Sequence, residues 1–248
     1  MSIDGKEPKV ADAAPDGRRA HLGEIAEDAS GFGLGDLRLI RDMFVRPRAV
    51  MAAYDAEGST AGGRYPRPLR FYLALNGLFL LFIALLGGFE SAFQTMPAEA
   101  LDALLRTSGK SRDEFLADLD QWTGMLSIPG VTLILAAPLY QVIKRWSPLD
   151  SRTDFHQTFS FLNAWTLYQM PMALLMLLAP QIFMILSAPV MLAAAGLAFA
   201  LLGKDRWWTT ARGAWLKGLV LLVLITVLMI PASLVTYGLG LAAAVYLP

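Results

Sequence analysis

The chain contains no cysteine and only two histidines, His21 and His156. The absence of cysteine excludes disulfides, thiolate metal sites and cysteine nucleophiles. Two histidines are too few for a multi-histidine metal centre, and motifs for phosphate binding or for an activated nucleophile are missing as well. We therefore expect no catalytic residue, no bound metal and no cofactor.

The chain also lacks charged residues deep within its long apolar stretches. Since a charge at the centre of a bilayer costs ~2.5 kcal/mol or more, this argues against ion-coupled transport and against acid–base chemistry inside the membrane. A helix needs about 20 mostly apolar residues to cross a bilayer. Five stretches approach that length, namely Phe71–Phe89, Ser127–Ile143, Phe161–Leu178, Ile182–Leu202 and Leu216–Leu247. The last is long and contains Pro231, so it is either one kinked span or a span followed by a short terminal piece.

Basic residues are distributed asymmetrically about these stretches. If each stretch crosses the membrane once, 18 of the 21 Lys and Arg residues lie on one face. The other three, Arg106, Lys110 and Arg112, lie in the connection 90–126, which also holds seven acidic residues. The positive-inside rule then predicts five spans with a cytoplasmic N-terminus and an external C-terminus. A basic cytoplasmic face is suited to anionic lipid and is not a reason to expect nucleic-acid binding.

The chain divides into three predicted regions: a disordered cytoplasmic tail (1–34), an amphipathic interfacial segment (35–69) and a five-span membrane domain (70–248) with its outer loop at 90–126. In the second region, Leu37, Ile40 and Phe44 recur at helical spacing between arginines. They predict a helix that ends near Pro47. This helix lies either in the lipid boundary, with its arginines at the headgroups, or against the inner loops of the protein itself.

The connection 90–126 is too long to be a turn. Leu101, Leu104 and Leu105 make one apolar stripe, and Ser111 and Glu114 have the spacing of a capping box. We expect a helical hairpin that lies on the outer surface or caps the bundle.

Tryptophans and glycines mark the last two stretches. Trp207, Trp208 and Trp215 flank the last inner connection, where an aromatic belt at headgroup level is expected. Gly238 and Gly240 predict close approach of a neighbouring helix.

Polar residues within the predicted spans are few. Asn163, Thr166 and Gln169 follow one another at a spacing of three on one face of the third stretch, and Asn76 lies in the first. Contacts between helices, at about 0.6–2 kcal/mol each, are the interpretation that we favour. The alternative is a ligand cavity at mid-depth, beside the backbone groups that prolines leave unpaired in four of the five stretches.

Asp154 and His156 stand just before the third stretch. They could form an orienting pair at the inner interface. Two positions apart on a helix, however, their side chains point about 200° apart. We therefore group them with Leu37, Ile40 and Phe44 as candidate interface residues and not as a catalytic dyad.

Three segments together resemble a known family. They are residues 40–50 with 64–72, residues 150–162 and residues 207–217. These segments resemble domain-of-unknown-function family 3667, a group of bacterial multi-span membrane proteins. The resemblance rests on an Arg-Pro element, an R-Y-x-x-P motif before the first span and a His/Phe-rich segment that leads into a middle span. The N-terminal zinc ribbon of many members is absent here. A looser similarity is to Yip1-type five-span proteins, which share the N-in, C-out layout. Both resemblances imply an architecture and no activity.

The sequence thus predicts an all-α, five-span protein of the bacterial inner membrane. The favoured function is non-enzymatic, that of a scaffold, assembly factor or accessory subunit of a membrane complex. Its expected partners are lipids and either another membrane protein or a second copy of the chain, with no nucleic acid. The alternative is binding or transport of a lipid or small amphiphile by proline-kinked helices. A cavity lined by Asn76, Asn163 and Gln169 would favour the alternative.

Overall fold

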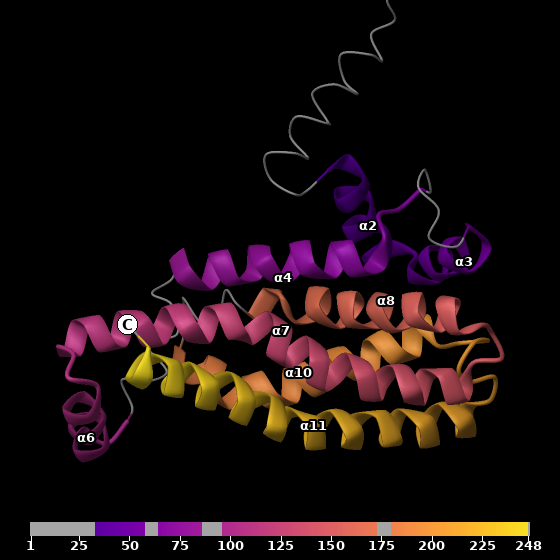
Figure 1. Ribbon diagram of the computed structural model, residues 1–248. Coiled ribbons are helices and arrows are strands. Elements are labelled where there is room, and N and C mark those ends of the chain that lie inside the picture. The colour runs from indigo at the N-terminus through magenta and orange to yellow at the C-terminus, as the bar shows by residue number, and fades with distance from the viewer. Residues whose placement is uncertain (1–32, 58–63, 86–95, 173–179, 248) are drawn as a thin grey trace, which may run out of the picture.

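The computed structural model describes residues 33–57, 64–85, 96–172 and 180–247 (Figure 1). No β-strand occurs in these ranges. Their helices are α2 (Leu34–Val45), α3 (Pro47–Glu57), α4 (Pro68–Leu85), α6 (Ala98–Ser108), α7 (Arg112–Trp146), α8 (Ser151–Gln169), α10 (Pro180–Leu202) and α11 (Ala211–Tyr246). The tail predicted for residues 1–34 lies almost wholly outside the described residues, as do residues 90–95 of the predicted outer loop.

Three helices are long and apolar enough to cross a membrane. They are α7, the segment Ile185–Leu202 of α10, and α11. A shorter apolar helix covers Pro68–Phe82 within α4. The chain is therefore a membrane protein, as its apolar stretches predicted.

Prolines have different effects at different places in the chain. Helix α11 continues from Ala211 to Tyr246 through Pro231, so the last apolar stretch is one helix and not a span with a separate terminal piece. Helix α10 likewise continues through Pro189. Helix α8, in contrast, ends at Gln169, and a turn at Met170 precedes Pro171. The proline ring restricts the residue before it, which accounts for an ending at this point.

The predicted capping box is present at the start of α7. The Ser111 side chain accepts a hydrogen bond from the Glu114 N–H, and the Glu114 carboxylate accepts one from the Ser111 N–H at 3.0 Å. Before it, α6 ends at Ser108 and is followed by the capping residue Gly109, whose φ of 70° suits glycine. The predicted hairpin differs in one respect, because its second arm is not separate from the second apolar stretch. Both belong to the continuous 35-residue helix α7.

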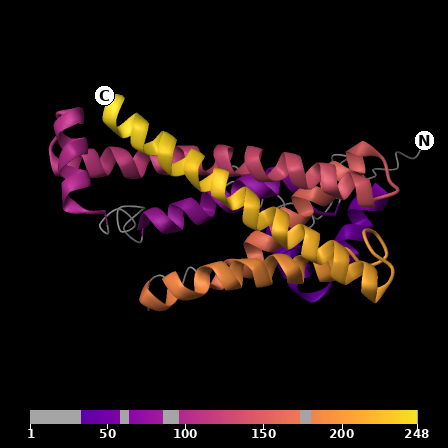
Figure 2. The ribbon, with the colours of Figure 1, turned by 90° about the horizontal axis from the view of Figure 1, so that it is seen from below.

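Helices α7 and α11 pack closely and cross in the view of Figure 2. Gly240 of α11 lies against Thr123 of α7, and a Cβ built on Gly240 would be 2.5 Å from the Thr123 Oγ1. A Cβ on Gly238 would meet nothing within 4 Å. Of the two glycines, Gly240 is therefore the one that sets the distance between the helices.

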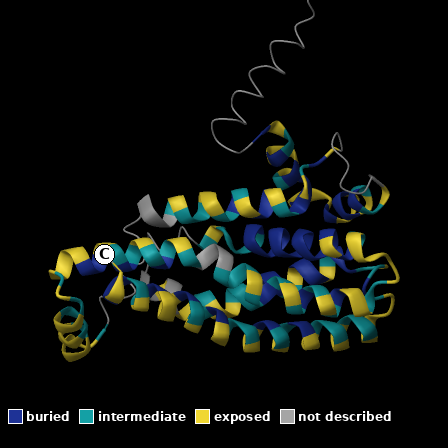
Figure 3. Ribbon diagram, in the orientation of Figure 1, coloured by how far each residue is buried: buried dark blue, intermediate teal, exposed yellow. Residues whose placement is uncertain are grey.

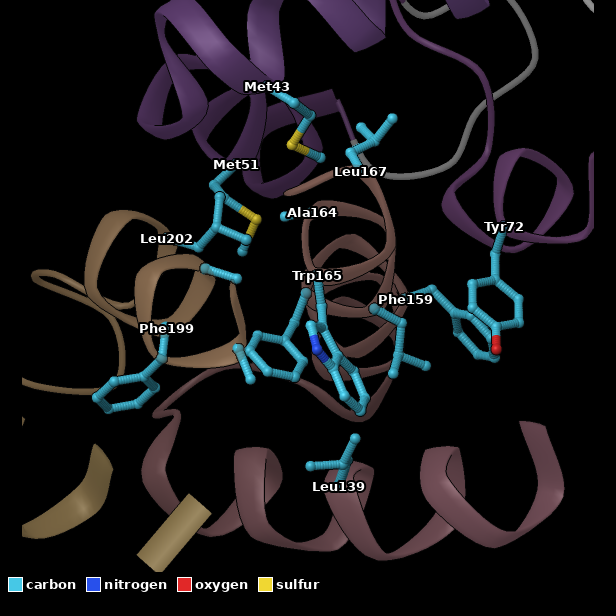
Figure 4. Close-up of a cluster of buried hydrophobic side chains, with 14 of the residues drawn as sticks. Met43, Met51, Tyr72, Leu139, Phe159, Ala164, Trp165, Leu167, Phe199 and Leu202 are labelled. Carbon is cyan, nitrogen blue, oxygen red and sulfur yellow. The ribbon is translucent and has the colours of Figure 1, made fainter. Parts of the chain in front are cut away.

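Helix α8 lies at the centre of the bundle. Every residue from His156 to Leu167 is buried (Figure 3). Helices α3, α4, α7 and α10 pack around it. Figure 4 shows part of the apolar cluster around it, in which Phe159, Trp165 and Leu167 of α8 are grouped with side chains of other helices: Met43, Met51, Tyr72, Leu139, Phe199 and Leu202.

Candidate functional site

Helix α8 carries polar side chains on several faces although it is enclosed by protein. The buried ones are Asp154, His156, Gln157, Thr158, Ser160, Asn163 and Thr166. Because buried polar groups need hydrogen-bonding partners, these residues decide what this part of the molecule can do. Some of them hold neighbouring segments in place, and others have atoms without a partner among the described residues.

One α8 side chain joins three parts of the chain. The Gln157 amide donates to the Asp55 carboxylate at 3.1 Å and accepts from the Trp207 Nε1–H at 2.8 Å. The Arg206 Nε–H donates to the other Asp55 oxygen at 2.6 Å. These four residues, which we call the polar clamp, tie α3 and the loop 203–210 to the central helix.

The loop 203–210 places Trp207 inside the protein. Trp207 is 1% exposed and stacks on Phe199 with ring centroids 5.8 Å apart. A Cβ on Gly203 would lie 2.6 Å from the Trp207 ring and 2.7 Å from the Phe199 carbonyl, so the loop needs glycine there. The expectation of a headgroup belt thus does not describe Trp207, whereas Trp215, 80% exposed, is free to occupy one.

Three further α8 side chains donate hydrogen bonds to backbone carbonyls of other helices. The Asn163 Nδ2 donates to the Pro68 carbonyl at the start of α4, at 2.9 Å. The Tyr168 hydroxyl donates to the Met43 carbonyl of α2 at 2.8 Å, and the Trp165 Nε1 donates to a carbonyl of α10 at 2.9 Å. Together with the polar clamp, the bonds from Asn163 and Tyr168 hold α2, α3 and the start of α4 against the bundle.

A buried carboxylate stabilises the same segment from within. Asp42 of α2 accepts from the Tyr65 hydroxyl at 2.7 Å and lies 2.8 Å from Arg41, 3.1 Å from Arg46 and 3.6 Å from Arg64. The hydrogen bond from Tyr65, followed by those from the arginines, holds the pKa of Asp42 well below its usual range. Burial and the neighbouring carboxylate raise the pKa of the Tyr65 hydroxyl. The cluster therefore contains an ionised Asp42 and joins α2 to the lead-in of α4.

Because the pKa of Asp42 is lowered in the folded protein, its carboxylate stabilises the fold above the ordinary aspartate pKa of about 4, and this contribution is lost as the pH falls towards the folded value. We expect Asp42→Asn to lower the thermal unfolding midpoint at pH 7 and to reduce the further decrease between pH 7 and pH 3. The measurement is thermal unfolding in detergent across that range. An unchanged pH slope in the variant would show that Asp42 does not couple protonation to stability.

The structure does not gather the four predicted polar residues into one site. The Asn76 amide donates to the Tyr72 carbonyl within its own helix. Asn163 bonds to α4, Thr166 is buried, and Gln169 is partly buried at the end of α8. Among the described residues, Asn163 is the member of this set whose side chain is hydrogen-bonded to another helix.

The predicted interface residues divide between two environments. Leu37 and Phe44 are 60% and 52% exposed, while Ile40 is partly buried. On the other side of α2, Leu39 and Met43 are fully buried. Helix α2 thus packs on the protein through one face and presents exposed apolar side chains on another, and its placement in the lipid boundary stays a prediction.

Asp154 and His156 both lie on α8 and are both buried. Two positions apart on a helix, their side chains leave it on nearly opposite sides, as the spacing predicted. Burial raises the pKa of Asp154 and lowers the pKa of His156, so it favours the neutral form of each.

The described residues contain no group of three or more His, Asp or Glu side chains placed to hold a metal ion. No protein-family model, curated protein or solved structure matches the chain. Its function is therefore argued from its own geometry. Sequence reasoning missed Asp42, Asp55, Gln157 and Arg206, because nothing in their local sequence distinguishes them from solvated polar residues.

Proposed function

We propose that this protein is a non-enzymatic scaffold or accessory subunit of the bacterial inner membrane, with five spans, a cytoplasmic N-terminus and an external C-terminus. The observation that carries the proposal is the polar clamp. Asp55, Gln157, Arg206 and Trp207 bond to one another across α3, α8 and the loop 203–210, and they hold α3, which packs on α2, against the bundle. Side chains engaged in this way position a surface for partners.

The surface held in this way is the outer face of α2. Four of its exposed apolar residues, which we call the α2 ridge, are Leu34, Leu37, Phe44 and Val45. Helical spacing puts them on one side of the helix, together with the exposed Arg38 and Arg41. A helix with an apolar face and adjacent arginines suits the boundary of an anionic leaflet. The ridge would therefore lie in the cytoplasmic headgroup region.

The proposed topology is tested with reporter fusions. Because 18 of the 21 basic residues would lie inside, a phosphatase reporter fused after Pro248 should be active and one fused after Lys204 should be silent. A reporter that works only in cytoplasm should give the opposite pattern at the same two sites. Phosphatase activity at both sites, or at Lys204 alone, contradicts the five-span layout.

The placement of the α2 ridge is tested in the intact protein, whose lack of cysteine permits single labelling sites. Spin labels at Leu37→Cys and Phe44→Cys, in vesicles with anionic lipid, should be relaxed more by oxygen than by a water-soluble nickel complex. The exposed Asp113→Cys serves as the reference site and should show the reverse. If the nickel complex relaxes the labels on the ridge more strongly, the ridge faces water and not lipid.

The scaffold proposal itself is tested by purification from native membranes in mild detergent, with proteins and lipids identified by mass spectrometry. Wild type should retain a protein partner, or a second copy, in a fixed ratio. Asp55→Ala removes the carboxylate that Gln157 and Arg206 share and should lose that partner. Asp113→Ala is the control, since Asp113 is exposed on α7, away from the polar clamp. A partner-free wild type would contradict the proposal.

The second candidate is binding or transport of a lipid or small amphiphile. It is favoured by buried polar atoms on α8 that have no hydrogen-bonding partner among the described residues. They are the two Asp154 carboxylate oxygens and three further atoms, His156 Nδ1, Ser160 Oγ and Asn163 Oδ1.

A further inference from the structure

His156, Ser160 and Asn163 lie on one side of α8, and Asp154 lies on the opposite side. Helical geometry places residues 156, 160 and 163 within about 60° of one another around the axis and spreads them over about 10 Å along it. The side chains are all buried, with Ser160 and Asn163 inaccessible and His156 8% exposed. We call His156, Ser160 and Asn163 the polar row. Leu167, the next residue on this side, is buried and apolar, so the row ends there.

The chemistry at the deep end of the polar row is determined by Asn163. Its Nδ2 donates to the Pro68 carbonyl, and because a carbonyl only accepts, the amide cannot be turned round. The unpartnered atom is therefore the Oδ1, which only accepts hydrogen bonds. An anion at this position would face an acceptor, so the complementary group must be a donor.

The other two members of the row accept a neutral group equally well. A serine hydroxyl both donates and accepts. Burial lowers the pKa of His156, so the neutral imidazole offers either one donor or one acceptor at Nδ1. The row contains no carboxylate to balance a cation, and an unpaired buried charge is strongly disfavoured. Neutral O–H groups match all three positions.

We propose that the polar row binds neutral hydroxyl groups, which enter from the His156 end and reach Asn163 at the closed end. The same chemistry has two sources, the glycerol headgroup of a neutral lipid and a file of water molecules. The inference deepens the second proposed function and is independent of the scaffold proposal. Since the row stops at Leu167, it is a blind site and not a path across the membrane.

The test uses the full chain in phosphatidylcholine nanodiscs, with and without a monoacylglycerol, and follows thermal unfolding. Ser160→Ala removes one hydroxyl of the row. The matched control is Thr158→Val on the same helix, because the Thr158 hydroxyl already donates to the Asp154 carbonyl. If hydroxyl groups occupy the row, Ser160→Ala should lower the unfolding midpoint by about 2–4 °C.

The two sources give different results in the same experiment. If a lipid headgroup occupies the row, monoacylglycerol raises the midpoint of wild type and of Thr158→Val but not of Ser160→Ala. If water occupies it, Ser160→Ala lowers the midpoint and monoacylglycerol has no effect on any variant. A raised midpoint for Ser160→Ala in both kinds of disc overturns the proposal, because it shows that the hydroxyl was buried without a partner. None of these results depends on partner retention, so the scaffold proposal stands or fails separately.

Discussion

Gly240→Ala is expected to destabilise the bundle by about 1–3 kcal/mol, the range for overpacking a close contact. The added methyl group would lie 2.5 Å from the Thr123 Oγ1 and 3.1 Å from the Thr123 Cα. The second contact is with backbone, which a change of rotamer cannot relieve, so α7 and α11 would have to separate. Thermal unfolding in detergent measures the effect.

Gly238→Ala is the matched control for this prediction. Its added methyl group would meet nothing within 4 Å, and alanine favours helix over glycine by about 1 kcal/mol. Its unfolding midpoint should therefore be unchanged or raised. The double variant Thr123→Ala/Gly240→Ala should recover part of the loss, since it removes the contact with Oγ1 but not the contact with Cα. Equal midpoints for the two single variants would contradict the packing that we describe.

Trp207→Ala is expected to have the largest effect in the polar clamp, about 3–5 kcal/mol. It removes a buried indole that stacks on Phe199, and it leaves the Gln157 Oε1 without its donor. Trp207→Phe should lose less, about 1–3 kcal/mol, because it keeps an aromatic ring and removes the hydrogen bond. The measurements are thermal unfolding and the labelling rate of a cysteine at Met51, a buried position on α3.

Trp215→Ala is the control, because Trp215 is exposed on the first turns of α11. It should change neither the midpoint in detergent nor the labelling rate at position 51. If Trp207→Ala leaves the cysteine at Met51 unlabelled while the bundle loses stability, Trp207 supports the core and does not hold α3. The polar clamp would then cease to explain how the α2 ridge is held.

The proposed functions differ in what they require of the polar residues. A scaffold requires them to fix one segment against another, which the polar clamp and the bond from Tyr168 to α2 do directly. A binder requires a set of polar atoms that the protein itself does not satisfy. The polar row provides such a set within two helical turns of α8. Both arrangements lie on the same helix, and separate variants test them.

Much of the local structure could be predicted from the sequence. Of the five apolar stretches that hydropathy identified, three correspond to described helices long and apolar enough to cross a membrane, because that property depends on the segment itself. The capping box at Ser111 and Glu114 is likewise local, since it is determined by residues three positions apart. The sequence also predicted the end of α2 at Pro47, within two residues.

The tertiary structure alone decided which polar residues meet. Asp42 bonds to a residue 23 positions away, Gln157 to one 50 positions away and Asp55 to one 151 positions away. A hydropathy profile treats such side chains as exposed to water. It measures how a segment partitions between water and an apolar phase, and it contains no information on which distant residues pack against that segment. For the same reason Trp207 was expected in a headgroup belt and is found in the core. The apolar helices and the caps follow from nearby residues, whereas the polar clamp and the polar row exist only because packing buries residues 156–167 of α8.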